Sequence, residues 1–214
     1  MTVIDQTRSQ AQQKRNLRTA TDDHVGHLTG VLAAAFQHDP IFEWLMPNEA
    51  TRQARLRRFF ELELRQVALR HGTVWTSSEL SGAALCLPPG GWRVPTRVLF
   101  TQGPRFARAF GARLPRAAGL LSAIERRHLR EPHYYYAYIG VFPEAQGQGL
   151  GTALMRPTLD HCDGEGLPAY LEASSERNAA LYERLGFEVE DELRFAGSPP
   201  LRLMLRPPRT RRPT

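Results

Sequence analysis

The segment from Tyr134 to Gly151 constrains the fold of this chain more than any other. It begins with a run of aromatic and β-branched residues, which favours a strand, and passes a proline into the glycine-rich loop Gln146-Gly147-Gln148-Gly149-Leu150-Gly151, which opens a helix. A strand that leads through glycines into a helix presents several free backbone N–H groups at the helix N-terminus. Such groups bind phosphate, and glycine lets the anion approach them. We therefore expect an α/β fold that holds a phosphate or pyrophosphate at this loop.

Two common phosphate-binding loops do not fit this spacing. A P-loop needs Lys and then Ser or Thr after its last glycine, but Gly151 is followed by Thr152-Ala153. A dinucleotide-binding fingerprint needs three glycines at another spacing and an acidic residue after the next strand. The pattern here is Gln-x-x-Gly-x-Gly, and it follows the strand end Gly140-Val141-Phe142-Pro143.

A second pattern lies downstream and is independent of the first. The run Leu167 to Ala173 predicts a short strand, and Asn178 and Tyr182 follow it one helical turn apart on one face. Gly186-Phe187 closes the segment. The full order of strand, Q-x-x-G-x-G, helix, strand, N-x-x-x-Y and G-F resembles motifs A and B of the Gcn5-related N-acetyltransferase (GNAT) superfamily, whose members bind acyl-CoA.

This resemblance covers about residues 17–205 and implies one GNAT domain, which we place at residues 17–206. The expected fold is α/β, with a central, mostly antiparallel sheet splayed between its fourth and fifth strands and flanked by helices. Residues 92–131 are expected to form two helices, a longer segment than a minimal acetyltransferase core needs. Residues 1–16 are polar and residues 207–214 are rich in Pro and Arg, so we expect both to be disordered.

The resemblance implies acetyl-CoA (coenzyme A) as the acyl donor and no metal. The loop amides are expected to hold the pyrophosphate, and the pantetheine arm is expected to enter the gap in the sheet. There the N–H of Val141 would donate to the thioester carbonyl, and Asn178 would bond the arm, unless it only caps its helix. The expected cofactor-binding residues are Ile139, Val141, Gln146, Gly147, Gln148, Gly149, Gly151, Thr152 and Asn178.

The expected catalytic residues are Tyr182, which the resemblance implies, and Glu172, which its position in the sequence suggests. Tyr182 would act as the general acid that protonates the departing thiolate, with packing under the cofactor as the alternative reading. Glu172 lies at the end of a strand beside the expected splay, where it would accept the amine proton or, alternatively, bond loop amides. His128 and His133 are the other candidate bases, whereas Glu144 is expected to be exposed.

Strict alternation along the strand would place Tyr134, Tyr136 and Tyr138 on one face, either as core or as lining of the acceptor pocket. The acceptor-facing segments are not distinctive enough to name a substrate. The scaffold, including Leu129-Arg130-Glu131-Pro132 and the stretch from Leu171 to Phe187, resembles the puromycin N-acetyltransferase-like branch of the family.

Composition limits the other function classes. The net charge is +6, and Lys14 is the single lysine among 28 basic residues. A basic chain suggests nucleic acid, but no nucleic-acid-binding motif accompanies the arginines, which also suit the polyanionic coenzyme A. Cys86 and Cys162 form no disulfide framework, and neither an apolar leader nor a transmembrane run is present. We expect a cytoplasmic protein without a nucleic-acid or membrane partner and leave a homodimer open.

The sequence thus predicts an acetyl-CoA-dependent N-acetyltransferase. It would transfer the acyl group to the primary amine of a small molecule by direct attack in a ternary complex. A protein or peptide N-acetyltransferase is the alternative within the class. A catalytically idle CoA-binding regulatory module is the alternative outside it, since a fold does not fix a function.

Overall fold

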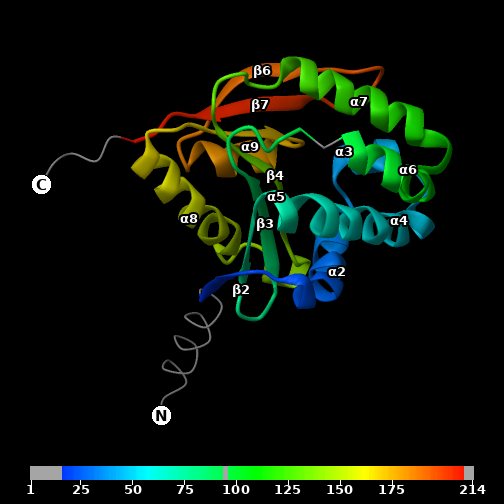
Figure 1. Ribbon diagram of the computed structural model, residues 1–214, viewed down its shortest axis with the longest axis horizontal. Helices are drawn as coiled ribbons and strands as arrows, with labels where there is room; N and C mark the ends of the chain where they lie inside the picture. Colours follow the sequence, from blue (N-terminus) through cyan, green and yellow to red (C-terminus); the bar gives the residue numbers. More distant parts are fainter. Residues whose placement is uncertain (1–15, 94–95, 210–214) are drawn as a thin grey trace, which may run out of the picture.

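The computed structural model describes residues 16–93 and 96–209, whose strands form a seven-stranded sheet in the order β1-β2-β3-β4-β5-β7-β6 (Figure 1). The strands are β1 (Leu17–Thr19), β2 (Thr73–Ser77), β3 (Gly82–Leu87), β4 (Tyr134–Val141), β5 (Ala169–Ala173), β6 (Glu188–Leu193) and β7 (Leu201–Arg206). Neighbouring strands are antiparallel except β4 and β5, which are parallel. The predicted mixed α/β fold is confirmed.

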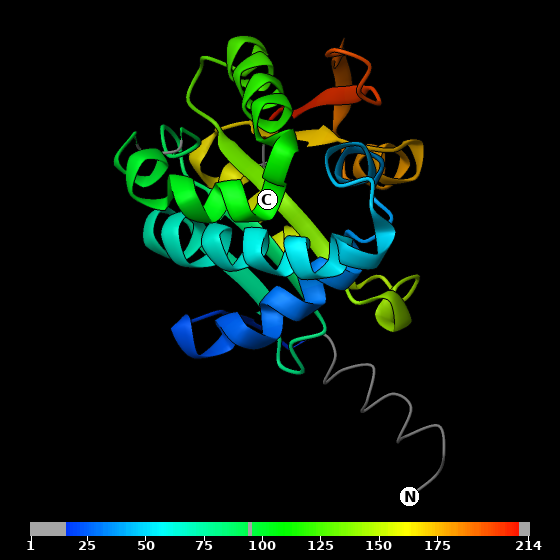
Figure 2. The same ribbon diagram turned by 90° about the vertical axis from the view of Figure 1, so that its right-hand side faces the viewer.

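Helices cover both faces of this sheet. Their bounds are α2 (Val25–Ala35), α3 (Pro40–Leu45), α4 (Glu49–Leu62), α5 (Leu69–His71), α6 (Thr96–Phe110), α7 (Leu114–Arg127), α8 (Leu150–Glu165) and α9 (Glu176–Glu183), with a π-helical segment η2 (Glu63–Ala68) between α4 and α5. Helices α2, α4, α6 and α7 lie over one face, as Figure 2 shows, and α8 packs on the other. The two helices expected within residues 92–131 are α6 and α7.

The core between α2 and the sheet depends on one close approach. A Cβ placed on Gly140 in β4 would lie 2.8 Å from Leu32 Cδ2 and 3.1 Å from the Ala35 Cβ. Glycine therefore lets α2 pack directly on the strand. Next to this contact, the rings of Phe36 and Phe60 lie 5.1 Å apart and extend the core towards α4.

A β-bulge in β4 changes which tyrosines share a face. Between two paired positions, β3 advances by one residue and β4 by two, so Ala137 is the extra residue. The Tyr136 hydroxyl donates to the Met155 carbonyl in α8 at 2.6 Å, whereas Tyr138 packs among aromatic rings of α2 and α4. The prediction of one face for Tyr134, Tyr136 and Tyr138 is therefore wrong for Tyr138, because a bulge shifts the alternation by one residue.

The sheet opens where the sequence predicts a splay. Strands β4 and β5 pair only between Tyr134–Tyr136 and Ala169–Leu171. Beyond these pairs β4 continues to Val141 and β5 to Ala173 without a shared ladder. The gap between the fourth and fifth strands is confirmed, and the strands that border it carry the expected site residues Ile139, Val141 and Glu172.

The two predictions of disorder fall mainly on residues 1–15 and 210–214, which lie outside the described residues. Within the described part, the Asn16 carbonyl accepts a hydrogen bond from Ser78 N–H, and Arg209 N–H donates to Asp163. Across residues 16–93 and 96–209, none of the helices combines the length and hydropathy that a membrane span requires.

Candidate functional site

The glycine-rich loop ends in an open helix N-terminus. Gly147 and Gly149 have φ angles of 74° and 79°, a region that favours glycine, and Gly149 directly precedes α8. A Cβ on either residue would meet no heavy atom of the described chain within 4 Å. The N-terminus of α8 has no side-chain cap, so its first N–H groups and the positive end of the helix dipole face this open space. The arrangement suits an anion.

Two glutamines hold the loop in this shape. Gln146 Nε2 donates to the Val141 carbonyl at 3.0 Å, and Gln148 Nε2 donates to the Glu144 carbonyl at 3.2 Å. Both side chains are therefore bonded to the protein backbone, which leaves the loop's own amides to bind a ligand. Thr152 lies in the first turn of α8, half-buried, within the same stretch.

The end of β4 presents unpaired backbone groups to the gap in the sheet. Phe142 N–H donates to the Ser81 carbonyl, and Gly140 pairs with Ala83 of β3. Because successive residues of a strand direct their N–H groups to opposite edges, Ile139 and Val141 direct theirs away from β3. Both therefore line the splay, next to the loop.

The loop after β5 leads into α9, which carries the second motif. Ser175 supplies the helix cap, since its Oγ accepts from Asn178 N–H at 3.2 Å. The Asn178 side chain is therefore not the cap. One turn later, Tyr182 is buried against Phe187, with ring centroids 6.0 Å apart. Burial, and then the charge of Asp39, raise the pKa of Tyr182, which keeps its hydroxyl protonated as a general acid requires.

The three candidate bases form one chain of contacts. Glu172 Oε2 accepts a hydrogen bond from the Tyr135 hydroxyl at 2.7 Å, and Glu172 Oε1 lies 3.4 Å from His128 Nδ1. His128 Nε2 lies 3.0 Å from His133 Nε2, and His133 Nδ1–H donates to the Glu131 carbonyl at 2.7 Å. The sequence suggested these residues as rivals, but the structure makes them neighbours in a single buried unit.

Aromatic rings shield this unit from water. His128 and His133 are 3% and 1% exposed, and Trp92 stacks on His128 with centroids 4.0 Å apart. Burial lowers the pKa of His133. Glu144 is exposed, as expected. Among the described residues no group of three or more His, Cys, Asp or Glu side chains is arranged to hold a metal ion.

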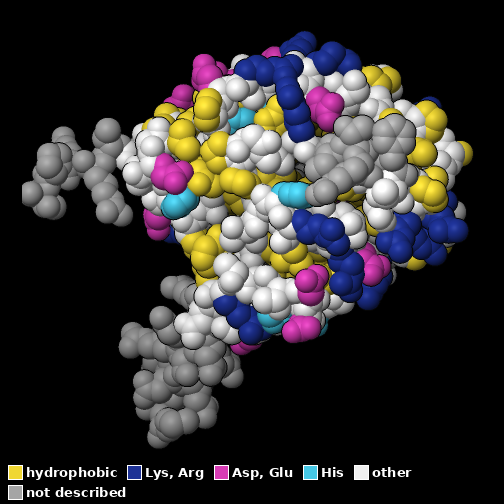
Figure 3. Space-filling model, viewed as in Figure 1, with side chains coloured by type: hydrophobic (Ala, Val, Ile, Leu, Met, Phe, Trp, Pro, Cys, Tyr) yellow, Lys and Arg dark blue, Asp and Glu magenta, His cyan; other side chains and the backbone are white. Residues whose placement is uncertain are grey.

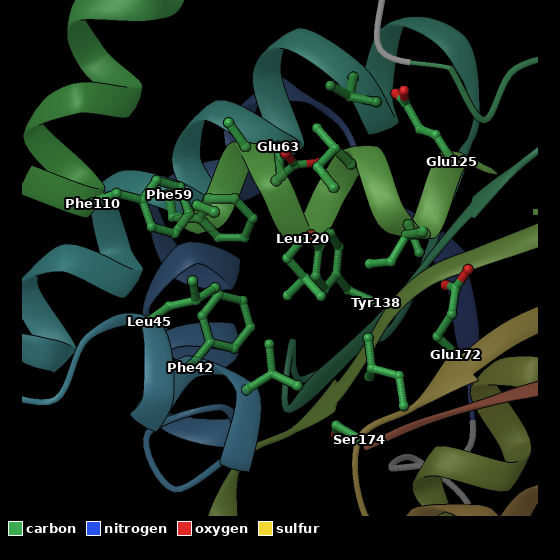
Figure 4. Close-up of a pocket in the computed structure, with 18 of the residues that line it drawn as sticks. Phe42, Leu45, Phe59, Glu63, Phe110, Leu120, Glu125, Tyr138, Glu172 and Ser174 are labelled. Atoms are coloured by element: carbon green, nitrogen blue, oxygen red, sulfur yellow. The ribbon is translucent and has the colours of Figure 1, made fainter. Parts of the chain in front are cut away.

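A cavity of about 440 Å³ lies between the sheet and the helical layer, beside Glu172 (Figure 4). Most of its lining is apolar, from rings such as Phe42, Phe59 and Phe110 and from leucines of α7. Its charged lining is acidic, and no Lys or Arg belongs to the described residues that form it. The acidic residues are Asp39, Glu63, Glu125 and Glu172.

The basic residues of the helical layer lie outside this cavity. Arg58, Arg65, Arg105 and Arg108 of α4, η2 and α6 are exposed and border a separate surface depression. Figure 3 shows Arg side chains in this region, on the right of the view. The net charge of +6 therefore describes the outer surface and not the cavity.

Glu63 is a residue of the cavity wall that the sequence analysis missed. It lies in the π-helical segment η2 and lines the cavity, with 9% of its surface exposed. A signal was present, because Leu56, Phe60 and Val67 share a helical spacing that also places position 63 on the buried face. Asp39 differs from Glu63 because its carboxylate has hydrogen-bond partners. It accepts from N–H groups of α3 and from the Ser174 hydroxyl.

With this geometry in place, comparison with known sequences decides the family. A sequence model described as the acetyltransferase (GNAT) family matches residues 39–187, which is most of the chain and includes both motifs. The chain belongs to the GNAT family of acetyltransferases. Use of acetyl-CoA is general for this family. The resemblance to the puromycin N-acetyltransferase-like branch stays a prediction.

Individual relatives agree with this assignment. The chain is 29% identical to an uncharacterized N-acetyltransferase of Schizosaccharomyces pombe over 84% of its own length and 78% of the relative. It is 46% identical to a mycothiol acetyltransferase of Streptomyces coelicolor, but only over 56 residues, which are 25% of this chain and 18% of that protein. The latter match is therefore local.

Solved structures share the whole fold. A Corynebacterium glutamicum protein described as histone acetyltransferase HPA2 and related acetyltransferase superposes with a TM-score of 0.71 at 28% identity, over 92% of this chain and 97% of that one. Arylalkylamine N-acetyltransferase 2 from Aedes aegypti superposes with a TM-score of 0.54 at 13% identity, over 90% and 98% of the two chains. At that identity the likeness concerns the fold alone.

Proposed function

We propose that this GNAT acetyltransferase transfers the acetyl group of acetyl-CoA to the primary amine of a small molecule, by direct attack in a ternary complex. The observation that carries the proposal is the cavity beside Glu172, which combines an apolar lining with acidic side chains and no described Lys or Arg. An amine with an apolar body is complementary to such a cavity in both shape and charge. Its position next to the β4–β5 gap brings an acceptor near the donor.

On the donor side, we assign the pyrophosphate to the amides of the loop Gln146-Gly147-Gln148-Gly149 and of Gly151 and Thr152. The positive φ values of the loop glycines and the uncapped start of α8 support this assignment. The pantetheine arm would lie in the splay against Ile139 and Val141, with Asn178 as a hydrogen-bond partner. The Val141 N–H would then polarise the thioester carbonyl.

On the acceptor side, Glu172 takes the proton of the amine. Its Oε1 receives no hydrogen bond from any described residue, whereas Oε2 is held by Tyr135. Oε1 is itself buried, so an amine that enters the cavity, or a water beside it, would supply the hydrogen bond that Oε1 lacks. His128 Nδ1 lies 3.4 Å from Oε1 and stabilises protonated Glu172 by accepting a hydrogen bond from it.

The reaction balances with these groups. The amine nitrogen forms a C–N bond to the acetyl carbon, the C–S bond of the thioester breaks, and the amine proton goes to Glu172. Tyr182 gives its hydroxyl proton to the departing thiolate. After product release, Glu172 loses its proton to solvent and Tyr182 regains one from it. A thiol is already a fair leaving group, so Tyr182 assists the step without being indispensable.

Release of free CoA thiol from acetyl-CoA by the full chain, with a panel of amines, tests the proposal. The panel contains arylalkylamines, aliphatic amines, and peptides with a free N-terminus or lysine. Acetylation of a small amine above the hydrolysis background supports it. Turnover with peptides alone would favour a protein or peptide N-acetyltransferase, and CoA binding without any turnover would favour an idle module.

A further inference from the structure

We propose that Glu63 forms a second cation-binding subsite in the acceptor cavity, so that the preferred acceptors are diamines with an apolar body between two basic groups. The inference rests on the proposed function in one respect, namely that the acceptor occupies this cavity. It adds a ligand class and a recognition residue that the acetyl transfer itself does not require.

The position of Glu63 is the first support. Glu63 is the first residue of η2, where the helix changes from α to π geometry. Such π segments occur frequently at functional sites because they redirect side chains. Its helical neighbours Phe59 and Val67 line the same cavity. Glu63 is therefore a carboxyl group inserted into an otherwise apolar helical wall.

The absence of a protein partner is the second support. No described residue donates a hydrogen bond to Glu63 or forms an ion pair with it, although the group is 9% exposed. An unpaired carboxylate in apolar surroundings is costly, and proteins ordinarily pair such groups. Burial raises the pKa of Glu63 from 4.5 to about 7. A bound ammonium or guanidinium group would supply the missing partner and restore the charged form.

The separation from Glu172 is the third support. Glu172 lies on β5 at the splay, where the thioester must meet the reacting amine, whereas Glu63 lies in the helical layer. Figure 4 shows the two carboxyl groups on different walls, with Tyr138 and Leu120 between them in the view. One amine cannot both react at the splay and neutralise Glu63. The second group that Glu63 binds must therefore belong to the far end of the same acceptor.

A pair of isosteric probes tests this inference. 4-(Aminomethyl)benzylamine carries a second ammonium where 4-ethylbenzylamine carries a methyl group, and both present the same reacting amine. Steady-state kinetics give kcat and KM for each probe. Calorimetry on the CoA-loaded protein gives Kd without any turnover.

The wild-type protein should prefer the diamine by about 10- to 100-fold in kcat/KM and in Kd, the value of one charge-assisted hydrogen bond. Glu63→Gln should remove this preference by raising KM and Kd for the diamine. Glu61→Gln is the matched control, because Glu61 is exposed and pairs with Arg65 alone within residues 16–93 and 96–209. It should keep the preference.

Three results would overturn the subsite: equal affinity of the wild type for both probes, a preference that survives in Glu63→Gln, or an equal loss of kcat for both probes. The last result would make Glu63 the general base. If no amine is acetylated, the proposed function fails, but the calorimetric comparison still decides the subsite.

A second measurement uses the wild-type protein alone, so it tests the subsite even if Glu63→Gln does not fold. The ratio of the two Kd values in the wild type should grow in favour of the diamine between pH 6 and 8, as Glu63 ionises. Because both probes carry the same reacting amine, the protonation of that amine affects both Kd values alike and cancels in their ratio. The other titratable groups that line the cavity are Asp39, Glu125, His128, Tyr135, Tyr138 and Glu172. A ratio independent of pH would contradict the role of Glu63.

Discussion

His128 Nε2 lies 3.0 Å from His133 Nε2, so one proton is shared between two buried imidazole rings. The Glu131 carbonyl can only accept, which fixes the proton of His133 on Nδ1. With neutral His133, its Nε2 accepts from His128 Nε2–H. The remaining nitrogen, His128 Nδ1, then presents its lone pair to Glu172 Oε1 at 3.4 Å. The geometry therefore links Glu172 to both histidines in one chain of contacts.

The first prediction concerns Glu172 as the base. Glu172→Gln keeps the shape of the side chain but cannot take a proton, so kcat should fall by about 100- to 10,000-fold. An amine with a pKa near 10.4 reacts only as the free base, so wild-type kcat/KM should rise with pH from about 6 to 9. The acid limb of this rise should flatten in the variant. Exposed Glu144→Gln is the control, and a wild-type profile in Glu172→Gln would place the base elsewhere.

The second prediction tests whether the histidines act through Glu172. His133→Asn should lower kcat and shift the acid limb of the pH profile, because it removes the proton partner of His128. The double variant with Glu172→Gln should be no slower than Glu172→Gln alone, since residues that act as a unit are not additive. Fully additive losses in this cycle would show that His133 contributes only to folding or to another step.

The third prediction concerns Tyr182. Tyr182→Phe should lower kcat by about 10- to 1,000-fold while the Kd of acetyl-CoA stays nearly constant, because a hydroxyl acting on the leaving group matters only in the transition state. Tyr134→Phe serves as the control, since Tyr134 donates to Glu165 away from the gap. If pre-steady-state kinetics show a rate-limiting chemical step and an unchanged kcat, Tyr182 only packs against Phe187.

The fourth prediction tests the phosphate site. Gly149→Val should abolish acetyl-CoA binding, because a branched residue disfavours the φ of 79° and fills the open space before α8. Gly164→Ala near the C-terminal end of α8, where an added Cβ would meet no described heavy atom within 4 Å, is the control and should bind normally. Calorimetry on variants with native circular dichroism makes the comparison. Normal CoA binding by folded Gly149→Val would exclude this loop as the site.

The fifth prediction gives the sign of the pH dependence caused by Glu63. Its pKa is about 7 in the folded chain and 4.5 when unfolded, so between these values the unfolded state loses the proton first. The free energy of unfolding should therefore fall as pH rises from 4.5 to 7, by up to about 3 kcal/mol. Glu63→Gln should remove this part of the slope and stabilise the ligand-free protein at pH 8. Urea unfolding at several pH values measures both effects.

The local parts of the fold and of the donor site could be predicted from the sequence alone. The spacing of Gly147 and Gly149, the pair Asn178 and Tyr182, and the strand before the loop depend on residues that are close in the chain. Their conformations follow from turn, cap and helix geometry. The open start of α8 follows from the same local geometry, whereas the splay between β4 and β5 was expected from the family resemblance.

Only the tertiary structure decided the acceptor side. The bulge at Ala137 moved Tyr138 to the other face, which strict alternation could not foresee because a bulge depends on the register between two strands. The union of Glu172, His128 and His133 arises because residues more than 30 positions apart meet under Trp92. Glu63 is buried without a partner among the described residues because the helical layer packs over the sheet around it. Chain-local rules determined the glycine loop and the helix start that we propose for the donor. Burial and long-range contact, which no local rule contains, determined the cavity that we propose for the acceptor.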